Sequence, residues 1–374
     1  MSNKIRLAVI FGGRSGEHEV SLMSAASILS VLDPHKYEVL QIGITTKGQW
    51  LTGEQVLTAF QAHHYEGLKP AVLLPQPGSN TLYALEMGKL QPISPVDVVF
   101  PVLHGTFGED GTLQGFLELA DVAYVGAGVL GSAAGMDKGL FKHVMQANDI
   151  PVLEYAIYNR SDIQKDMAGV IRQCEGLADY PLFVKPANLG SSVGISKANN
   201  RAELVNSFEM AAAYDRRVIV ERGISAREIE ISVLGNEAPI ASVPGEVIPK
   251  DIFYSYEDKY LNGVAELVIP AQLSEERSEL MRALAVRAYK AIDCAGMARV
   301  DFFIDKNTDE IFLGELNTIP GFTQISMYPK LWQASGLSYA TLVESLIALA
   351  FERKAERDKT EREFKAKYGA QRVQ

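Results

Sequence analysis

Cysteine is scarce in this sequence, and long hydrophobic runs are missing. The 374 residues include two cysteines, Cys174 and Cys294, which cannot build the disulfide framework of a small secreted domain and fit no metal-binding spacing. No apolar run approaches the roughly 20 residues of a membrane-spanning helix, and the short run 7–11 ends in two glycines without the cleavage site of a signal peptide. We therefore expect a cytoplasmic protein with no membrane partner.

Basic residues are also under-represented relative to acidic ones. Lys and Arg total 36 against 46 for Asp and Glu, so the formal net charge is -10. This charge opposes non-specific binding to nucleic acid, which is therefore not expected as a partner. With 47% hydrophobic and 22% charged residues, the composition is that of an ordinary globular protein. At roughly 100 to 200 residues per domain, the length predicts two or three domains.

The hydrophobic pattern of residues 1–124 predicts an N-terminal α/β domain. Three apolar, β-rich runs alternate with helical spacing, which is typical of an open parallel, Rossmann-like sheet. Residues 52–92 interrupt this pattern without a clean period. We expect them to form an irregular insertion with one short hairpin near 72–85.

The rest of the chain predicts two further units and a tail, so the expected fold class is α/β (α+β multidomain). Residues 125–222 mix helical and strand patterns, and residues 223–353 are strand-rich with a long amphipathic helix. Loop 249–264 is dense in aromatic and charged residues, which is typical of a lid, although a buried aromatic plug is the alternative. Residues 354–374 are charged and poor in apolar residues, so we expect a solvated tail.

A small-residue loop follows Lys185, which stands at the end of an apolar strand. The loop contains Gly190, Ser191, Ser192 and Gly194. Such a loop brings backbone N–H groups and hydroxyls close to phosphates, and the lysine adds a positive charge. A hairpin turn with an exposed lysine is an equal alternative, because the Walker spacing is absent.

Two predicted neighbouring strands carry polar side chains in otherwise apolar surroundings. Arg299 shares one face of its strand with Asp301, and Glu315 shares a face with Asn317, because side chains alternate with period two. If the strands pair, two carboxylates and an amide oxygen form a ligand set suited to Mg²⁺ with nucleotide phosphates. Arg299 then neutralises a transferring phosphoryl group. A solvent-facing ion pair is the alternative, and the turn at Gly321 carries no signal alone.

Four other residues stand where strands begin or end. Glu221 and Glu228 flank a short loop, a spacing that suits carboxylates holding adenosine hydroxyls, although either could be a surface residue. Glu17 and His104 follow two predicted parallel strands, at the edge where open α/β sheets bind ligands. A lone histidine is more often structural than catalytic, but this location favours a functional role.

Taken together, these motifs make the sequence resemble the D-alanine:D-alanine ligases, members of the ATP-grasp superfamily, from about Lys4 to Arg353. The matching stretches, in chain order, are Phe11-Gly12-Gly13, Glu17-His18-Glu19-Val20-Ser21, Leu103-His104-Gly105, Gly108-Glu109-Asp110-Gly111, Met136-Asp137-Lys138, Lys185-Pro186, Gly190-Ser191-Ser192-Val193-Gly194, Lys259-Tyr260, Arg299-Val300-Asp301, Glu315-Leu316-Asn317-Thr318 and Pro320-Gly321. The resemblance implies an ATP-grasp fold behind the N-terminal domain. It also implies ADP-forming ligation of two D-alanines through a D-alanyl phosphate, for peptidoglycan precursors. The implied cofactors are ATP and two Mg²⁺ or Mn²⁺ ions, and a homodimer is expected.

The resemblance also assigns roles by motif position. Those for ATP fall on Lys138, Lys185, Ser191, Ser192, Glu221, Glu228 and Lys259, and those for metal on Asp301, Glu315 and Asn317. Glu17 is expected to pair with the ammonium of the first D-alanine, with His104 beside it as a candidate proton acceptor. Arg299 and the Gly321 N–H are expected to stabilise the oxyanion of the tetrahedral intermediate. Ser326 and Met327 are expected to hold the carboxylate of the second substrate. Ser191 and Tyr260 are expected to hydrogen-bond with Glu17.

The residue at position 260 bears on the second substrate. Relatives that make D-alanyl-D-lactate are expected to carry phenylalanine or histidine at this lid position, so Tyr260 favours the dipeptide. Two alternatives stay open at this point. One is another ATP-grasp carboxylate–amine ligase, and the other is a catalytically silent nucleotide-binding module, which would be expected to have lost part of the charged cluster.

Overall fold

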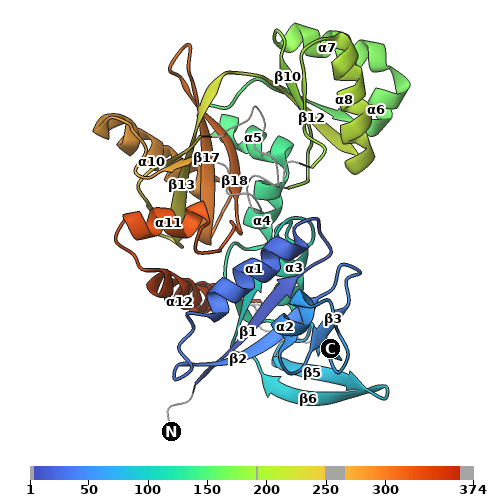
Figure 1. Ribbon diagram of the computed structural model, residues 1–374, viewed down its shortest axis with the longest axis vertical. Coiled ribbons are helices and arrows are strands. Elements are labelled where there is room, and N and C mark those ends of the chain that lie inside the picture. The colour runs from blue at the N-terminus through green and yellow to red at the C-terminus, as the bar shows by residue number, and fades with distance from the viewer. Residues whose placement is uncertain (1–3, 191–192, 249–265, 363–374) are drawn as a thin grey trace, which may run out of the picture.

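The computed structural model describes residues 4–190, 193–248 and 266–362 (Figure 1). The expected lid loop, 249–264, lies outside these ranges, and so do Ser191, Ser192, Lys259 and Tyr260. The described chain forms a mixed α/β structure with three sheets of eight, four and six strands. In Figure 1 the four-stranded unit lies at one end of the molecule and the eight-stranded unit at the other, with the six-stranded sheet between them.

The eight-stranded sheet contains the N-terminal strands in the order β6-β5-β4-β3-β2-β1-β7-β8. Its central strand β1 pairs in parallel with β2 and β7, and its last six residues are buried, which matches its apolar sequence. The elements of this part of the chain are β1 (Ile5–Gly12), α1 (His18–Leu29), β2 (Tyr37–Ile44), β3 (Trp50–Thr52), α2 (Val56–Gln61), β4 (Lys69–Leu73), β5 (Thr81–Glu86), β6 (Lys89–Pro95), β7 (Val98–Val102), α3 (Thr112–Leu119) and β8 (Ala123–Tyr124).

Residues 52–92 correct the expectation of an irregular insertion in a parallel sheet. The expected hairpin is present as β4 and β5, but β6 then adds an edge strand, and strands β3 to β6 continue the sheet in antiparallel fashion from β2 outward. The pattern was hidden because β6 is almost entirely exposed and contains Pro92 and Pro95. Proline is tolerated at a sheet edge, where its missing N–H faces solvent, so neither alternation nor composition marked the strand.

The four-stranded sheet has the order β11-β10-β12-β9 and its own core, which includes Val184, Val220 and Phe208. Three helices cover it, and two more connect it to the N-terminal sheet (Figure 1). The elements are α4 (Val129–Met136), α5 (Lys138–Ala147), β9 (Tyr155–Asn159), α6 (Arg160–Lys165), α7 (Met167–Leu177), β10 (Leu182–Pro186), β11 (Ser196–Ala198), α8 (Arg201–Tyr214) and β12 (Arg217–Arg222).

The six-stranded sheet follows the path β16-β15-β13-β17-β18, with β14 paired to β13. Its long strands β13 and β17 pair over ten residues each, which places the polar positions of β17 in a fixed register with β18. The elements are β13 (Ala226–Gly235), β14 (Ile240–Ala241), β15 (Gly245–Ile248), β16 (Glu266–Val268), α10 (Glu275–Ala291), β17 (Gly296–Asp305), β18 (Ile311–Asn317), α11 (Met327–Ala334) and α12 (Tyr339–Arg357).

One hydrophobic core joins the N-terminal sheet to the end of the chain. Val9 and Phe100 from that sheet belong to the same buried cluster as Phe322, Trp332 and Leu346. Loop 318–326 therefore sits on the N-terminal sheet although it is far from it in sequence. No single described helix is long and apolar enough to cross a membrane; α11 and α12 pass that test only as a pair bent by 105°.

Candidate active site

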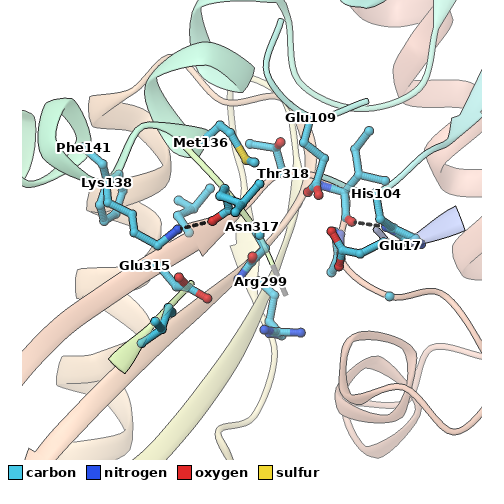
Figure 2. A pocket seen from close by; sticks show the side chains of 18 residues that line it. Glu17, His104, Glu109, Met136, Lys138, Phe141, Arg299, Glu315, Asn317 and Thr318 are labelled. Atoms are coloured by element: carbon cyan, nitrogen blue, oxygen red, sulfur yellow. Dashed lines mark hydrogen bonds between the residues drawn. The ribbon is translucent and has the colours of Figure 1, made fainter. Parts of the chain in front are cut away.

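A cleft of about 880 Å³, which includes space open to solvent, lies where the three sheets meet. Figure 2 shows Glu17, His104 and Glu109 on one side of it and Lys138 and Glu315 on the other, with Arg299 between them. The lining residues come from all three parts of the chain. The fold therefore brings together residues that the sequence predicted separately.

Strands β17 and β18 carry the charged cluster. The two strands are paired neighbours, which is the condition that the predicted metal site required. Asp301 lies directly opposite Glu315, and Arg299 directly opposite Asn317. Arg299 Nη2 is 2.6 Å from Asp301 Oδ2, and its Nε is 3.0 Å from Oε2 of Glu230. The Asn317 amide donates to Asp301 Oδ2 at 3.0 Å. The cluster therefore lies inside the protein, with side-chain exposures of 15% for Arg299 and 16% for Asp301, rather than as a solvent-facing ion pair.

This donor set fits a magnesium ion. Among the described residues, no three His, Cys, Asp or Glu side chains come together as a metal site. The set here is two carboxylates and the Asn317 amide oxygen, which suits a hard cation that takes few protein ligands and completes its shell with phosphate oxygens and water. Arg299 counterbalances part of the negative charge of Asp301 and Glu230 within this cluster.

Two lysines lie on either side of the Glu221 carboxylate. Lys185 Nζ lies 2.8 Å from one carboxylate oxygen of Glu221, and Lys142 Nζ lies 3.4 Å from the other. Burial by itself raises the pKa of Glu221, but the two ammonium charges lower it to about 2. Lys138 donates to the Leu189 carbonyl at 2.7 Å, which ties α5 to the glycine-rich loop.

Lys142 is a residue that the sequence prediction missed. Its side chain is 1% exposed, and burial is the main cause that lowers its pKa. The available signal was its position, one helical turn after Lys138 on the same face of α5. The carboxylate of Glu221, which was expected to hold adenosine, lies between two lysines. Glu228 lies near enough to Lys185 to raise the pKa of that lysine.

Glu17, the residue directly before α1, reaches toward the glycine-rich loop. A Cβ atom at Gly105 would lie 2.6 Å from Glu17 Oε2, and one at Gly190 would lie 2.9 Å from it. Both positions therefore need glycine for Glu17 to occupy this place. Gly190 directly precedes Ser191, so the partner expected for Glu17 belongs to a loop that already contacts it.

His104 is buried on the side of the cleft away from Lys138 and Glu315. Its Nδ1 lies 2.9 Å from the Ile319 carbonyl oxygen and its Nε2 lies 3.1 Å from Ser24 Oγ. A carbonyl oxygen only accepts hydrogen bonds, so Nδ1 carries the proton and Nε2 accepts from the serine hydroxyl. Burial lowers the pKa of His104, which keeps the ring neutral.

Glu109 is a second residue without a role in the sequence prediction, although its motif, Gly-Glu-Asp-Gly, was recognised. Its Oε2 accepts from the Gly105 N–H at 2.7 Å and its Oε1 from the Ile319 N–H at 3.0 Å. Burial, followed by the nearby charge of Glu17, raises the pKa of Glu109 to about 8. Glu109 therefore retains its proton at neutral pH.

The remaining predicted residues lie at or near the end of β18. Gly321 lines the cleft. Ser326 and Met327 begin α11 next to it, where the Ser326 hydroxyl accepts from the Thr323 N–H at 3.1 Å. Neither residue is among those that line the cleft, but both stand at a helix N-terminus, a position that favours an anionic group.

Comparison with known proteins covers nearly the whole chain. Residues 6–127 match the family model described as D-ala D-ala ligase N-terminus, and residues 144–348 match the one described as D-ala D-ala ligase C-terminus. The D-alanine--D-alanine ligase of Natranaerobius thermophilus is 48% identical over 362 residues, covering 96% of this chain and 99% of the relative. That of Thermoanaerobacter pseudethanolicus is 51% identical over 356 residues, covering 93% and 97%.

Two solved structures are similar over the same extent. The D-alanine-D-alanine ligase from Coxiella burnetii superposes with a TM-score of 0.84 at 38% identity and covers 96% of this chain and 97% of the other. The VanG D-Ala:D-Ser ligase from Enterococcus faecalis superposes with a TM-score of 0.82 at 36% identity, covering 93% and 100%. The three sheets and the cleft between them thus belong to a fold shared with both.

Proposed function

The chain belongs to the D-alanine–D-alanine ligase family, and from its site we infer how it joins two D-alanines while ATP is converted to ADP and phosphate. It is an ATP-grasp enzyme, and its family supplies the dipeptide for peptidoglycan precursors. The observation that supports this function most strongly is the cleft itself. Glu315 faces it from one side and Glu17 from the other, with Arg299 between them, so an amino acid and a nucleotide can meet there.

For the nucleotide we propose that Lys138 and Lys185 bind the phosphates, with Ser191, Ser192 and Lys259 beside them. Glu221 and Glu228 are assigned to the nucleoside side of the same pocket. Support comes from the positive charge of Lys142 and Lys185, the two lysines that lie on either side of Glu221. A multiply charged phosphate chain is attracted to that charge, and low exposure to water strengthens the attraction.

For the metal we propose that Asp301, Glu315 and Asn317 hold two Mg²⁺ or Mn²⁺ ions. When bound, such ions neutralise the phosphate oxygens and polarise the transferring phosphoryl group. The protein's own contribution is the register of β17 and β18, which holds Asp301 opposite Glu315. Arg299 is kept oriented by Asp301 and Glu230, so its guanidinium is fixed before substrate arrives.

For the amino acids we propose that Glu17 binds the ammonium of the first D-alanine, whose carboxylate is phosphorylated by ATP. The amine of the second D-alanine then attacks the acyl phosphate and phosphate leaves. Arg299 and the Gly321 N–H stabilise the tetrahedral oxyanion. The second carboxylate binds at Ser326 and Met327, where the N-terminus of α11 favours negative charge.

Tyr260 and Ser191 are proposed to hydrogen-bond with Glu17 and so to couple closure of the lid, 249–264, to substrate binding. We propose D-alanine as the second substrate on the basis of Tyr260. The VanG neighbour, named for D-Ala:D-Ser ligation, makes D-serine the specific competitor to test. The proposed units are 1–124, 125–222 and 223–353 with the tail 354–374, in a cytoplasmic homodimer.

The function is tested by incubating the purified protein with ATP, Mg²⁺ and D-alanine, alone and with equimolar D-lactate or D-serine. ADP release is followed, and products are identified by mass spectrometry. We expect D-alanyl-D-alanine as the main product in every mixture. Glu315→Gln serves as the matched control, since it removes one charge from the metal site without changing shape. ADP release without dipeptide, or no ADP release, would contradict the proposal.

A further inference from the structure

Side chains hold the two residues that flank Pro320-Gly321 at both their backbone N–H and their backbone C=O. At Ile319, the N–H donates to Glu109 at 3.0 Å and the carbonyl accepts from His104 at 2.9 Å. At Phe322, the N–H donates to Ser24 Oγ at 3.2 Å and the carbonyl accepts from the Tyr339 hydroxyl at 2.6 Å. We call Ser24, His104, Glu109 and Tyr339 the clamp.

The clamp members come from widely separated elements. Ser24 lies on α1, His104 and Glu109 on the loop after β7, and Tyr339 on the first turn of α12. Ser24 and His104 are also bonded to each other, at 3.1 Å, so that one chain of hydrogen bonds runs from the Phe322 N–H to the Ile319 carbonyl. Ser24 is fully buried and His104 is 3% exposed. Bonds in such surroundings exchange little with water and hold their partners in one geometry.

We propose that the clamp positions the Ile319–Phe322 loop so that the Gly321 N–H points at the reacting carbonyl, and that Ser24, His104 and Tyr339 are positioning residues for ligation. This inference rests on the proposed function, which assigns the Gly321 N–H to the oxyanion. A donor acts on a transition state only if its place is fixed beforehand. Glycine at the centre of the loop cannot fix its own backbone, so the flanking residues must do it.

The clamp also gives His104 a different role from the proton acceptor expected from the sequence. Both of its ring nitrogens are occupied, Nδ1 as donor to a carbonyl and Nε2 as acceptor from a hydroxyl. To accept a proton from a substrate amine, Nε2 would have to give up Ser24. The clamp would then lose the bond that connects Phe322 to Ile319.

Two conservative substitutions test the clamp with matched controls. Ser24→Ala removes a hydroxyl that accepts a hydrogen bond from the Phe322 N–H and donates one to His104. Its control is Ser242→Ala, which removes an equally buried hydroxyl away from the cleft. That hydroxyl accepts from the Ser232 N–H and donates to a backbone carbonyl. Tyr339→Phe removes the hydroxyl from Phe322, and its control Tyr289→Phe removes one from the Gly235 carbonyl. We expect kcat for dipeptide formation to fall roughly 10- to 100-fold in each clamp variant, with KM for ATP unchanged, because misplacing a reacting group by about 1 Å costs that much.

A third pair separates positioning from proton transfer. His104→Asn keeps an N–H near the place of Nδ1 and can still donate to Ile319, but it cannot accept a proton at neutral pH; His104→Ala can do neither. We expect kcat of His104→Asn to exceed that of His104→Ala by about tenfold, as one retained hydrogen bond of about 1.4 kcal/mol implies.

The outcomes distinguish this inference from the proposed function. Failure of the unaltered enzyme to form D-alanyl-D-alanine refutes the proposed function, on which the clamp depends. Dipeptide formation by the unaltered enzyme with equal kcat in His104→Asn and His104→Ala refutes the clamp alone. So does an unchanged kcat in both Ser24→Ala and Tyr339→Phe, or an equal loss in their controls. Thermal unfolding of every variant verifies that the fold is intact.

Discussion

Glu109 makes the stability of the protein depend on pH in an unusual direction. Glu109 has an ordinary pKa of 4.5 when unfolded and a pKa of about 8 in the folded protein, owing to burial and to the charge of Glu17. Between these values the folded state binds more protons than the unfolded state. The contribution of Glu109 is therefore fully present below about pH 4.5 and is lost as pH rises through about 8.

The size of the effect follows from the two pKa values. At 1.36 kcal/mol per pKa unit, the whole shift corresponds to about 5 kcal/mol of stability. Roughly half of this stability is lost between about pH 6 and about pH 8.5. Glu109 lines a cleft that is open to water, which reduces the figure. We expect the free energy of unfolding to fall by about 2 kcal/mol over this interval because of this one group.

Glu109→Gln isolates this contribution, because glutamine does not titrate. The amide has a single acceptor oxygen, so the variant loses one of the two backbone hydrogen bonds at every pH, a constant cost of about 1 to 3 kcal/mol. Urea unfolding followed by tryptophan fluorescence measures the difference between unaltered protein and variant. Both tryptophans, Trp50 and Trp332, pack against the cores of the N-terminal sheet and its neighbours.

The expected result is a difference in unfolding free energy that shrinks by about 2 kcal/mol from about pH 6 to about pH 8.5. Other titrating groups are present in both proteins and largely cancel. A difference that stays constant over this range would refute the reasoning, since Glu109 would then be ionised throughout. A difference that grows with pH would refute it as well, since the folded state would then favour the charged carboxylate.

Three further outcomes follow from the site. Arg299→Met should abolish dipeptide formation, because the guanidinium is the fixed cation of the cluster. Circular dichroism and thermal unfolding should show an intact fold. Retained turnover would contradict the assignment of Arg299 to the oxyanion. Lys142→Met should raise KM for ATP roughly tenfold with a smaller change in kcat, because it removes one buried positive charge from beside Glu221. Steady-state kinetics measures this change, and Lys36→Met, at the surface, is the control. Tyr260→Phe should increase the share of D-alanyl-D-lactate formed from equimolar D-alanine and D-lactate, as measured by mass spectrometry; an unchanged product ratio would show that specificity lies elsewhere.

Local patterns predicted the clustering of charged side chains on β17 and β18. Alternation along a strand placed Arg299 with Asp301 on one face, and the structure confirms that the neighbouring strand brings Glu315 opposite Asp301. The same rules failed for β6, because an exposed edge strand with two prolines buries no alternating face. Periodicity reports burial, so it identifies elements that are buried on one side and passes over those that are not.

The sequence by itself determined most of the candidate site residues, though not Lys142 or Glu109, since glycine loops, paired carboxylates and lysines at strand ends are local features. Only the tertiary structure decided how those groups are held. Glu109 meets Ile319 across 210 positions of the chain, and Ser24 meets Phe322 across 298. Such contacts follow from the shared core that packs the end of the chain onto the N-terminal sheet. No spacing rule reaches that far, because a rule of period two or 3.6 describes neighbours within one element and not the packing between elements.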